Sequence, residues 1–127
     1  MAPTAARDGF RWHRAVEAGS LSSGRGRAAQ LDGRWIAVVQ DGDEYFATDD
    51  ACPHQGAPLS EGIVLHGLVI CPWHSWAFDV RSGRCARAPH VGIATYAARR
   101  RGEWIEVELP DGPSAADGVP NESSARP

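Results

Sequence analysis

Lysine is absent from this 127-residue chain, so arginine supplies all of its fixed positive charge, and the formal net charge at pH 7 is −3. A negative net charge excludes the broad basic field with which nucleic-acid-binding proteins attract phosphates. Long apolar runs are also missing, so neither a signal peptide at residues 1–14 nor a membrane span is expected. These absences predict a cytoplasmic protein with no nucleic-acid or membrane partner.

Cysteine is scarce, with three residues at Cys52, Cys71 and Cys85. An odd count argues against a secreted protein stabilised by disulfides. Cys52 and Cys71 lie in short motifs that also contain histidine, whereas Cys85 has no such neighbour. We therefore expect Cys85 to pack as a small hydrophobic residue and the other two cysteines to be metal ligands.

No segment shows a sustained apolar period of 3.6 residues, so long amphipathic helices are not expected. The length fits one domain with a core of modest size. Short apolar segments separated by turn residues predict an all-β fold. The expected strands cover 10–15, 27–31, 35–40, 45–48, 63–65, 68–70, 77–80 and 84–85, followed by a last hairpin of 93–98 with 104–109.

The two ends of the chain differ in composition from its centre. Residues 1–9 predict a flexible leader, and residues 111–127, rich in Gly, Pro, Ser, Ala and Asp, predict a disordered tail. The folded domain is expected at 10–110, with its metal-binding part at about 51–90. His66 is expected to be exposed in a hairpin turn, and Arg99-Arg100-Arg101 to be a solvated strand end.

Two short motifs carry the chemistry of the chain. Cys52-Pro53-His54 and Cys71-Pro72-Trp73-His74 are separated by sixteen residues. Thiolate and imidazole ligands supplied in pairs by two loops suit either a zinc ion or an iron–sulfur centre. Zinc fingers usually group cysteine with cysteine and histidine with histidine, because each pair closes its own turn on one ion. Pairs that mix sulfur and nitrogen favour a centre with two different metal atoms.

Residues Cys52 to Pro89 resemble the Rieske [2Fe–2S] ferredoxin family. The resemblance includes the segment 56–62 (Gly-Ala-Pro-Leu-Ser-Glu-Gly), Phe78-Asp79 and Ser82-Gly83. It implies an antiparallel β-sandwich with a small cluster-binding subdomain made of two ligand loops. It also implies one Rieske-type cluster per chain, with Cys52 and Cys71 on one iron and His54 and His74 on the other.

The resemblance further implies a function without catalysis on this chain. A soluble ferredoxin of this kind carries one electron at a time from an NAD(P)H-dependent flavin reductase to a terminal oxygenase that hydroxylates aromatic rings, through transient contacts. The chain is also similar to the small subunit of cytosolic NAD(P)H-dependent nitrite reductase, a stable part of an enzyme complex. A zinc-bound interaction module is a third hypothesis, and it predicts a colourless protein.

Departures from the high-potential branch of the family indicate a low reduction potential. Ala57 and Trp73 occupy the positions at which that branch has a disulfide between its loops. Trp76 and Phe78 stand where that branch has hydroxyl groups that donate hydrogen bonds to the cluster and to a ligand sulfur. Fewer donors leave the reduced, more negative cluster less stabilised. We expect a potential toward the low end of the Rieske range of roughly −150 to +300 mV.

Overall fold

The structure, a computed structural model, describes residues 9–53, 56–73, 76–88 and 90–110. The leader and tail expected at 1–9 and 111–127 lie outside these ranges apart from Gly9, and so do His54, His74 and Pro89. Regular structure in the described part consists of short strands and two single 3-10 turns, which confirms the all-β prediction. No helix there is long and apolar enough to cross a membrane.

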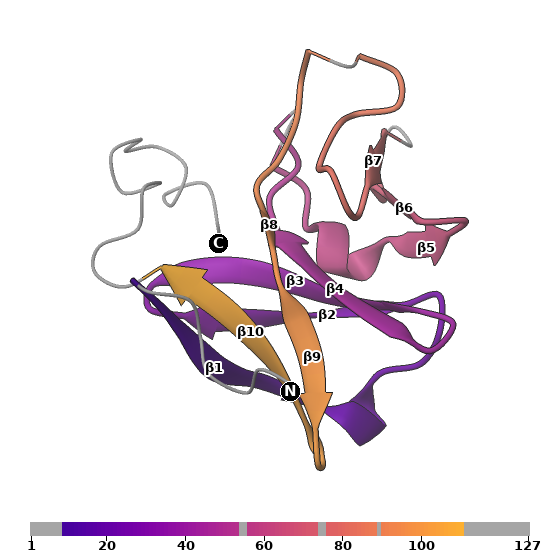
Figure 1. The fold of residues 1–127 in the computed structure, drawn as a ribbon. Helices are drawn as coiled ribbons and strands as arrows, with labels where there is room; N and C mark the ends of the chain where they lie inside the picture. Colours follow the sequence, from indigo (N-terminus) through magenta and orange to yellow (C-terminus); the bar gives the residue numbers. More distant parts are fainter. Residues whose placement is uncertain (1–8, 54–55, 74–75, 89, 111–127) are drawn as a thin grey trace.

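The strands form three antiparallel sheets, with orders β1-β10-β9, β2-β3-β4-β8 and β5-β6-β7. The first two sheets face each other, and the third lies at one end of the molecule (Figure 1). The strands are β1 (Phe10–Glu17), β2 (Gly26–Leu31), β3 (Arg34–Asp41), β4 (Glu44–Asp49), β5 (Ile63–Leu65), β6 (Leu68–Ile70), β7 (Ala77–Asp79), β8 (Thr95–Tyr96), β9 (Ala98–Arg101) and β10 (Trp104–Pro110). The 3-10 turns are η1 (Ala18–Ser20) and η2 (Leu59–Glu61).

Strand β3 contributes to two separate cores. Ile36 and Val38 pack into the sandwich core between the two larger sheets, whereas Ala37 and Val39 pack into the small-sheet core under β5-β6-β7. All four side chains are 0% exposed. Side chains of a strand alternate between its faces, so a strand covered on both faces has a continuous apolar run in its sequence. β3 therefore fixes the small sheet to the sandwich.

One expected strand is divided between two sheets. The segment 93–98 was predicted to pair with 104–109, but β8 pairs with β4, and it is β9 that pairs with β10. The chain crosses between the sheets at Ala97, whose carbonyl accepts a hydrogen bond from the Glu108 backbone N–H at 2.9 Å. The apolar pattern of this segment gives no sign of the crossing, because both sheets border the same core.

The arginine run consequently lies inside β9. Arg99 forms an ion pair with Glu106, opposite it on β10, at 2.7 Å, and its guanidinium lies 3.9 Å from the centre of the Trp12 ring. The Arg99 side chain is 20% exposed, so the prediction of a solvated strand end is wrong for this residue. Arg100 and Arg101 are exposed, as expected.

Candidate metal centre

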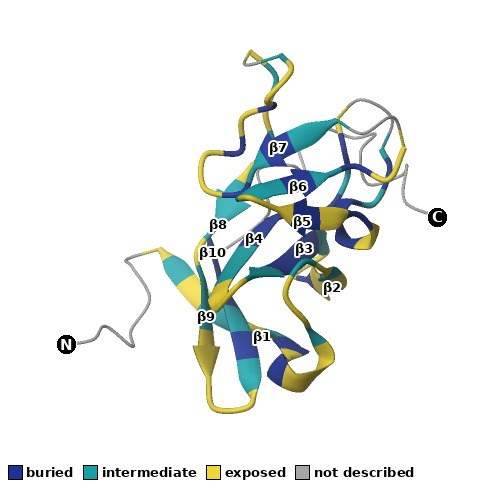
Figure 2. Cartoon of the chain, turned by 90° about the vertical axis from the view of Figure 1, so that its right-hand side faces the viewer, coloured by how far each residue is buried: buried dark blue, intermediate teal, exposed yellow. Residues whose placement is uncertain are grey.

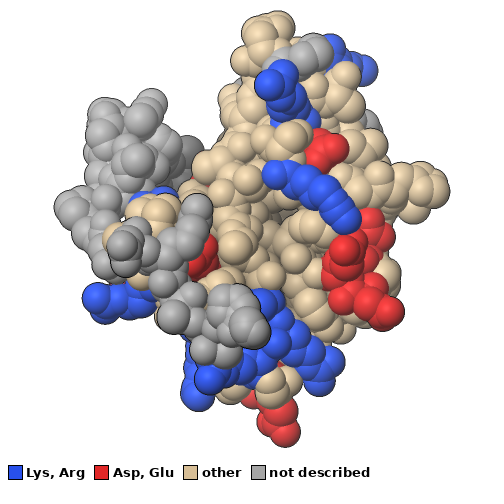
Figure 3. Space-filling model, in the orientation of Figure 1, with Lys and Arg blue, Asp and Glu red and all other residues tan. Residues whose placement is uncertain are grey.

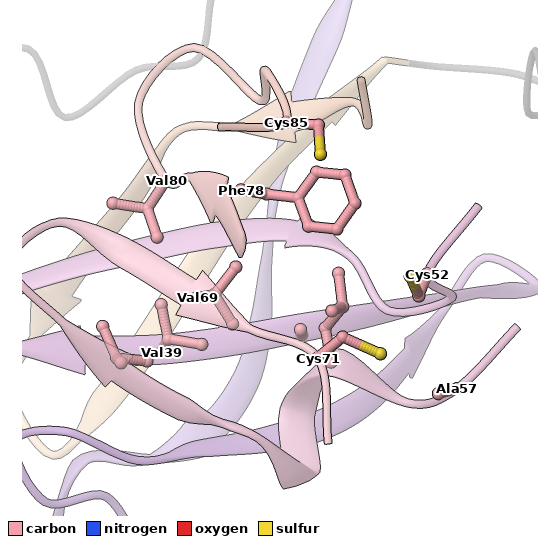
Figure 4. Packing of buried hydrophobic residues seen from close by; sticks show 11 residues of the cluster. Val39, Cys52, Ala57, Val69, Cys71, Phe78, Val80 and Cys85 are labelled. Carbon is pink, nitrogen blue, oxygen red and sulfur yellow. The ribbon is translucent and has the colours of Figure 1, made fainter. Parts of the chain in front are cut away.

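The two cysteines of the sequence motifs begin loops that are closed in the same way. The backbone N–H of Cys52 donates to the carbonyl of Ala57 at 2.9 Å, and that of Cys71 donates to the carbonyl of Trp76 at 2.7 Å. In each loop the bond joins the cysteine to the residue five positions later. Each cysteine therefore lies at the fixed base of its loop. Figure 4 shows the two cysteines at the same end of the small-sheet core.

The two cysteine side chains are buried and in contact. Cys52 is 1% exposed and Cys71 is 4% exposed. Burial raises the pKa of the Cys71 thiol to about 11; the backbone N–H of Trp73 lowers it, and the hydrogen-bonded Cys52 side chain raises it. Buried thiols that adjoin each other lose their protons together when a metal cation replaces them. This donor set fits the sulfur-bound iron of a [2Fe–2S] cluster.

His54 and His74, the other expected ligands, lie outside the described residues. Within the described part, no group of three or more His, Cys, Asp or Glu side chains is arranged to bind a metal ion. His66 is exposed in the turn between β5 and β6, as predicted, and His90 is also exposed. His13 is on β1, with its Nε2 3.6 Å from an Asp32 carboxylate oxygen, and β1 contributes to neither ligand loop.

The base of the site is apolar. Phe78 on β7 is 0% exposed, and Cys85, at 1%, pairs with it through an isolated β-bridge. In Figure 4 the Cys85 side chain lies beside the Phe78 ring. Both residues belong to the same core as Cys52 and Cys71, so the prediction that Cys85 packs as a small hydrophobic residue is confirmed. The phenyl ring has no hydroxyl with which to donate to a ligand sulfur.

Asp50 supports the first loop and was missed by the sequence analysis. It is 0% exposed, and its carboxylate accepts a hydrogen bond from the Ser60 N–H at 2.8 Å. Its backbone carbonyl accepts one from the Leu59 N–H at 2.6 Å. Both donors belong to the start of η2, where backbone N–H groups have no partner inside the turn. Asp50 thus ties the segment before Cys52 to the segment after Ala57.

The sequence profile of the Rieske [2Fe-2S] domain matches residues 11–97, which include both closed loops. The chain belongs to the Rieske [2Fe–2S] domain family. Its cofactor is accordingly a Rieske-type [2Fe–2S] cluster, and the two buried thiols of this Rieske domain fit the cysteine half of the ligand set. The fold prediction, an antiparallel β-sandwich with a small cluster-binding part, is confirmed as well.

Carrier proteins are among the relatives of this Rieske domain. The ferredoxin component of the naphthalene 1,2-dioxygenase system of Pseudomonas aeruginosa is 30% identical over 100 residues, which cover 78% of this chain and 96% of the relative. The solved ferredoxin of carbazole 1,9a-dioxygenase from Nocardioides aromaticivorans has a TM-score of 0.70 and 31% identity, over 79% of this chain and 98% of its own.

Other relatives belong to enzymes of different kinds. A structure from Mycobacterium tuberculosis, provisionally described as an NADH-dependent nitrite reductase small subunit, has a TM-score of 0.74 and 29% identity, over 81% of this chain and 98% of its own. The 4β-methylsterol monooxygenase of Methylococcus capsulatus is 32% identical over an alignment of 130 positions that covers 92% of this chain. The chain spans 34% of that monooxygenase, so the domain also occurs inside larger proteins.

Proposed function

We propose that this Rieske domain is a cytosolic one-electron carrier. It receives electrons from an NAD(P)H-dependent, flavin-containing reductase and passes them to the terminal oxygenase of an aromatic-ring hydroxylating system. The observation that carries the proposal is the contact between the buried side chains of Cys52 and Cys71, each at the base of a loop with the same closure. The similarity to the naphthalene and carbazole dioxygenase ferredoxins, which covers 96% and 98% of their lengths, supports the choice of system.

Four residues bind the cluster in this proposal. Cys52 and Cys71 supply thiolates to one iron, and His54 and His74 supply imidazoles to the other. The bound cluster supplies one-electron redox chemistry. The backbone N–H of Trp73 donates to the Cys71 sulfur and so stabilises its thiolate form. Because Phe78 adds no further donor, the potential lies toward the low end of the Rieske range.

The first test is the visible absorption spectrum of the purified protein, followed by EPR after reduction with dithionite. The proposal expects a red-brown protein whose reduced form gives the low average g value of mixed cysteine and histidine ligation. A colourless protein that contains stoichiometric zinc after anaerobic purification would overturn the electron-transfer reading in favour of the zinc-bound module.

The second test measures electron transfer from the reduced protein to an oxygenase. The reduced protein is mixed anaerobically with the terminal oxygenase of carbazole 1,9a-dioxygenase, and its reoxidation is followed at the wavelengths of the cluster. The proposal expects rapid transfer, and turnover of the oxygenase with the carrier at substoichiometric amounts.

The midpoint potential of the cluster in this protein is measured separately by redox titration. A midpoint in the upper half of the Rieske range contradicts the predicted effect of the missing donors.

The second candidate function is that of a nitrite reductase small subunit. It is favoured by the fold similarity to the Mycobacterium tuberculosis protein, whose TM-score exceeds that of the carbazole ferredoxin. A small subunit binds its large partner permanently, whereas a carrier dissociates after each transfer. Affinity purification of the tagged protein from its own cells separates the two: a stoichiometric sirohaem-containing partner supports the subunit, and a lone red-brown protein supports the carrier.

A further inference from the structure

The small sheet has apolar side chains on both of its faces. Val64, Val69 and Phe78 pair across the three strands, and they are 3%, 0% and 0% exposed because they face the small-sheet core. Their neighbours along each strand point to the opposite side. These neighbours form the outer face of the small sheet, which consists of the apolar residues Ile63, Leu65, Leu68, Ile70 and Ala77 together with Asp79.

The outer face is open to solvent. Ile63 and Leu65 are each 51% exposed, and Leu68, Ile70 and Ala77 are half-buried. Figure 2 looks onto this side of the molecule, with the exposed parts of β5 beside the partly covered β6 and β7. Continuous apolar runs such as 63–65 and 68–70 are typical of strands that are covered on both faces. Apolar side chains that lie together on an exposed face are often part of an interaction site.

The edge of the sheet, in contrast to its face, is already closed. The backbone N–H of Val64, which points away from β6, donates to the carbonyl of Gly24 at 2.9 Å. A partner therefore gains little by adding a strand beside β5. It must instead lie across the side chains of the outer face.

The outer face leads directly into the second ligand loop. Ile70 is followed by Cys71, and Ala77 is preceded by Trp76, whose carbonyl closes the loop. Trp73 in this loop is 50% exposed. A protein that rests on the outer face thus also borders the loop that carries a cluster ligand, which is the position an electron acceptor requires.

The area and the charge of the outer face indicate which kind of protein binds to it. Ile63, Leu65 and Trp73, each about half exposed, offer on the order of 300 Å² of apolar surface. A stable dimer buries roughly 800 Å² on each partner, whereas transient redox complexes are smaller. The outer face has one charged side chain, Asp79, at the end of the row that it forms with Leu65 and Leu68, and its carboxylate already accepts hydrogen bonds from the Arg81 and Ser82 backbone N–H groups. The rest of the face is apolar, so a charged partner surface would lose its hydration over most of it without gaining a counter-charge.

We propose that the outer face of the small sheet is the docking surface for the electron-accepting protein, which contacts it transiently with an uncharged, apolar patch beside its own redox centre. This inference rests on the proposed carrier function. It adds the place and the chemistry of the contact. Recognition is then mainly apolar, and transfer to the acceptor depends only weakly on ionic strength.

The test compares two variants that introduce the same charge on an exposed position of an edge strand. Leu65→Glu places a carboxylate in the outer face, and Gln30→Glu places one on β2, in a different sheet. Both variants are prepared as full-length protein with the cluster bound. The second-order rate of electron transfer to the carbazole 1,9a-dioxygenase terminal oxygenase is measured by stopped flow. Leu65→Glu is expected to slow transfer at least tenfold, and Gln30→Glu less than twofold.

Spectrum, EPR signal and midpoint potential should be the same in both variants, so that a slower rate reports docking. Equal rates for Leu65→Glu and the unmodified protein would overturn the inference while leaving the carrier function intact. A concentration-dependent dimer that Leu65→Glu dissociates would overturn it in favour of self-association. If the unmodified protein transfers no electron to the oxygenase, the carrier proposal fails and this inference falls with it.

Discussion

At the scale of single residues, the three cysteines are all buried and differ in the residues that surround them. Cys52, Cys71 and Cys85 are all less than 5% exposed. Cys71 adjoins a second thiol and receives a hydrogen bond from the Trp73 N–H, whereas Cys85 packs beside Phe78 in the apolar base. Two thiols that lie side by side can both bind one metal atom, whereas a thiol beside a phenyl ring packs as a small hydrophobic group. The same side chain is therefore suited to metal binding at one position and to packing at the other.

This difference predicts opposite results for the same substitution at two positions. Cys71→Ser should lose most of the iron and sulfide, because a serine hydroxyl replaces a soft ligand. Cys85→Ser should retain the cluster and lower the free energy of unfolding by about 1–3 kcal/mol, since it buries a hydroxyl without a designed partner. Iron analysis and chemical denaturation measure the two effects. Cluster loss in Cys85→Ser at unchanged fold would contradict the assignment of Cys85 to packing.

A substitution at Phe78 that adds a single hydroxyl group tests why the reduction potential is predicted to be low. Phe78→Tyr adds a hydroxyl in the small-sheet core that contains both proposed cysteine ligands. A hydrogen bond to a ligand sulfur stabilises the reduced, more negative cluster, so the midpoint potential should rise. Overpacking should reduce stability by about 1–3 kcal/mol. Phe46→Tyr, in a half-buried ring that lies under Arg81, is the control and should leave the potential unchanged. An equal shift in both variants would indicate a general change of the core.

At the scale of elements, Arg99 joins three strands. It pairs with Glu106 across β9 and β10, and its guanidinium stacks on Trp12 of β1. Arg99→Ala should lower the free energy of unfolding by roughly 1–3 kcal/mol, because it removes a partly buried ion pair and a cation–π contact. Arg100→Ala, on the same strand but exposed, should change it by less than about 0.5 kcal/mol. Urea denaturation of both variants measures the difference; equal losses would show that Arg99 acts as an ordinary surface residue.

The features that were predicted correctly depend on residues that are close together in the sequence. The turns at Asp32-Gly33 and His66-Gly67 adopt positive φ, as hairpin turns require, and the strands on either side of them form as expected. The metal motifs are equally local, because each pair of candidate ligands lies within four residues. These features depend on spacing along the chain and hence are readable from the sequence.

Features that depend on distant segments are not readable in this way. The change of sheet at Ala97 follows from packing between sheets, and the bond from Ser60 to the Asp50 carboxylate spans ten residues. The division of β3 between two cores leaves a trace in the apolar run 36–39, but the run does not say what covers each face. The outer face of the small sheet is equally hard to predict. The apolar runs 63–65 and 68–70 would be the same whether this face were covered by another part of the chain or by a partner protein.

At the scale of the whole molecule, the two cores divide the domain into parts with different dependence on the cluster. None of the described residues of either ligand loop belongs to the sandwich core, whereas the small-sheet core contains Cys52, Ala57 and Cys71. The proposed ligation cross-links the two loops, and a cross-link stabilises by reducing the entropy of the open chain. Loss of the cluster should therefore loosen one core while sparing the other.

Hydrogen exchange measures this division. After iron and sulfide are removed with a chelator and reductant, the Cys52 and Cys71 amides should exchange about 10–100 times faster, because their bonds to Ala57 and Trp76 close loops that are no longer cross-linked. Amides of Val38 and Val107, both 0% exposed in the sandwich core, should keep their protection. If Val107 loses protection as fully as Cys71, the domain unfolds as one unit when the cluster is lost, and the small sheet is not a separable module.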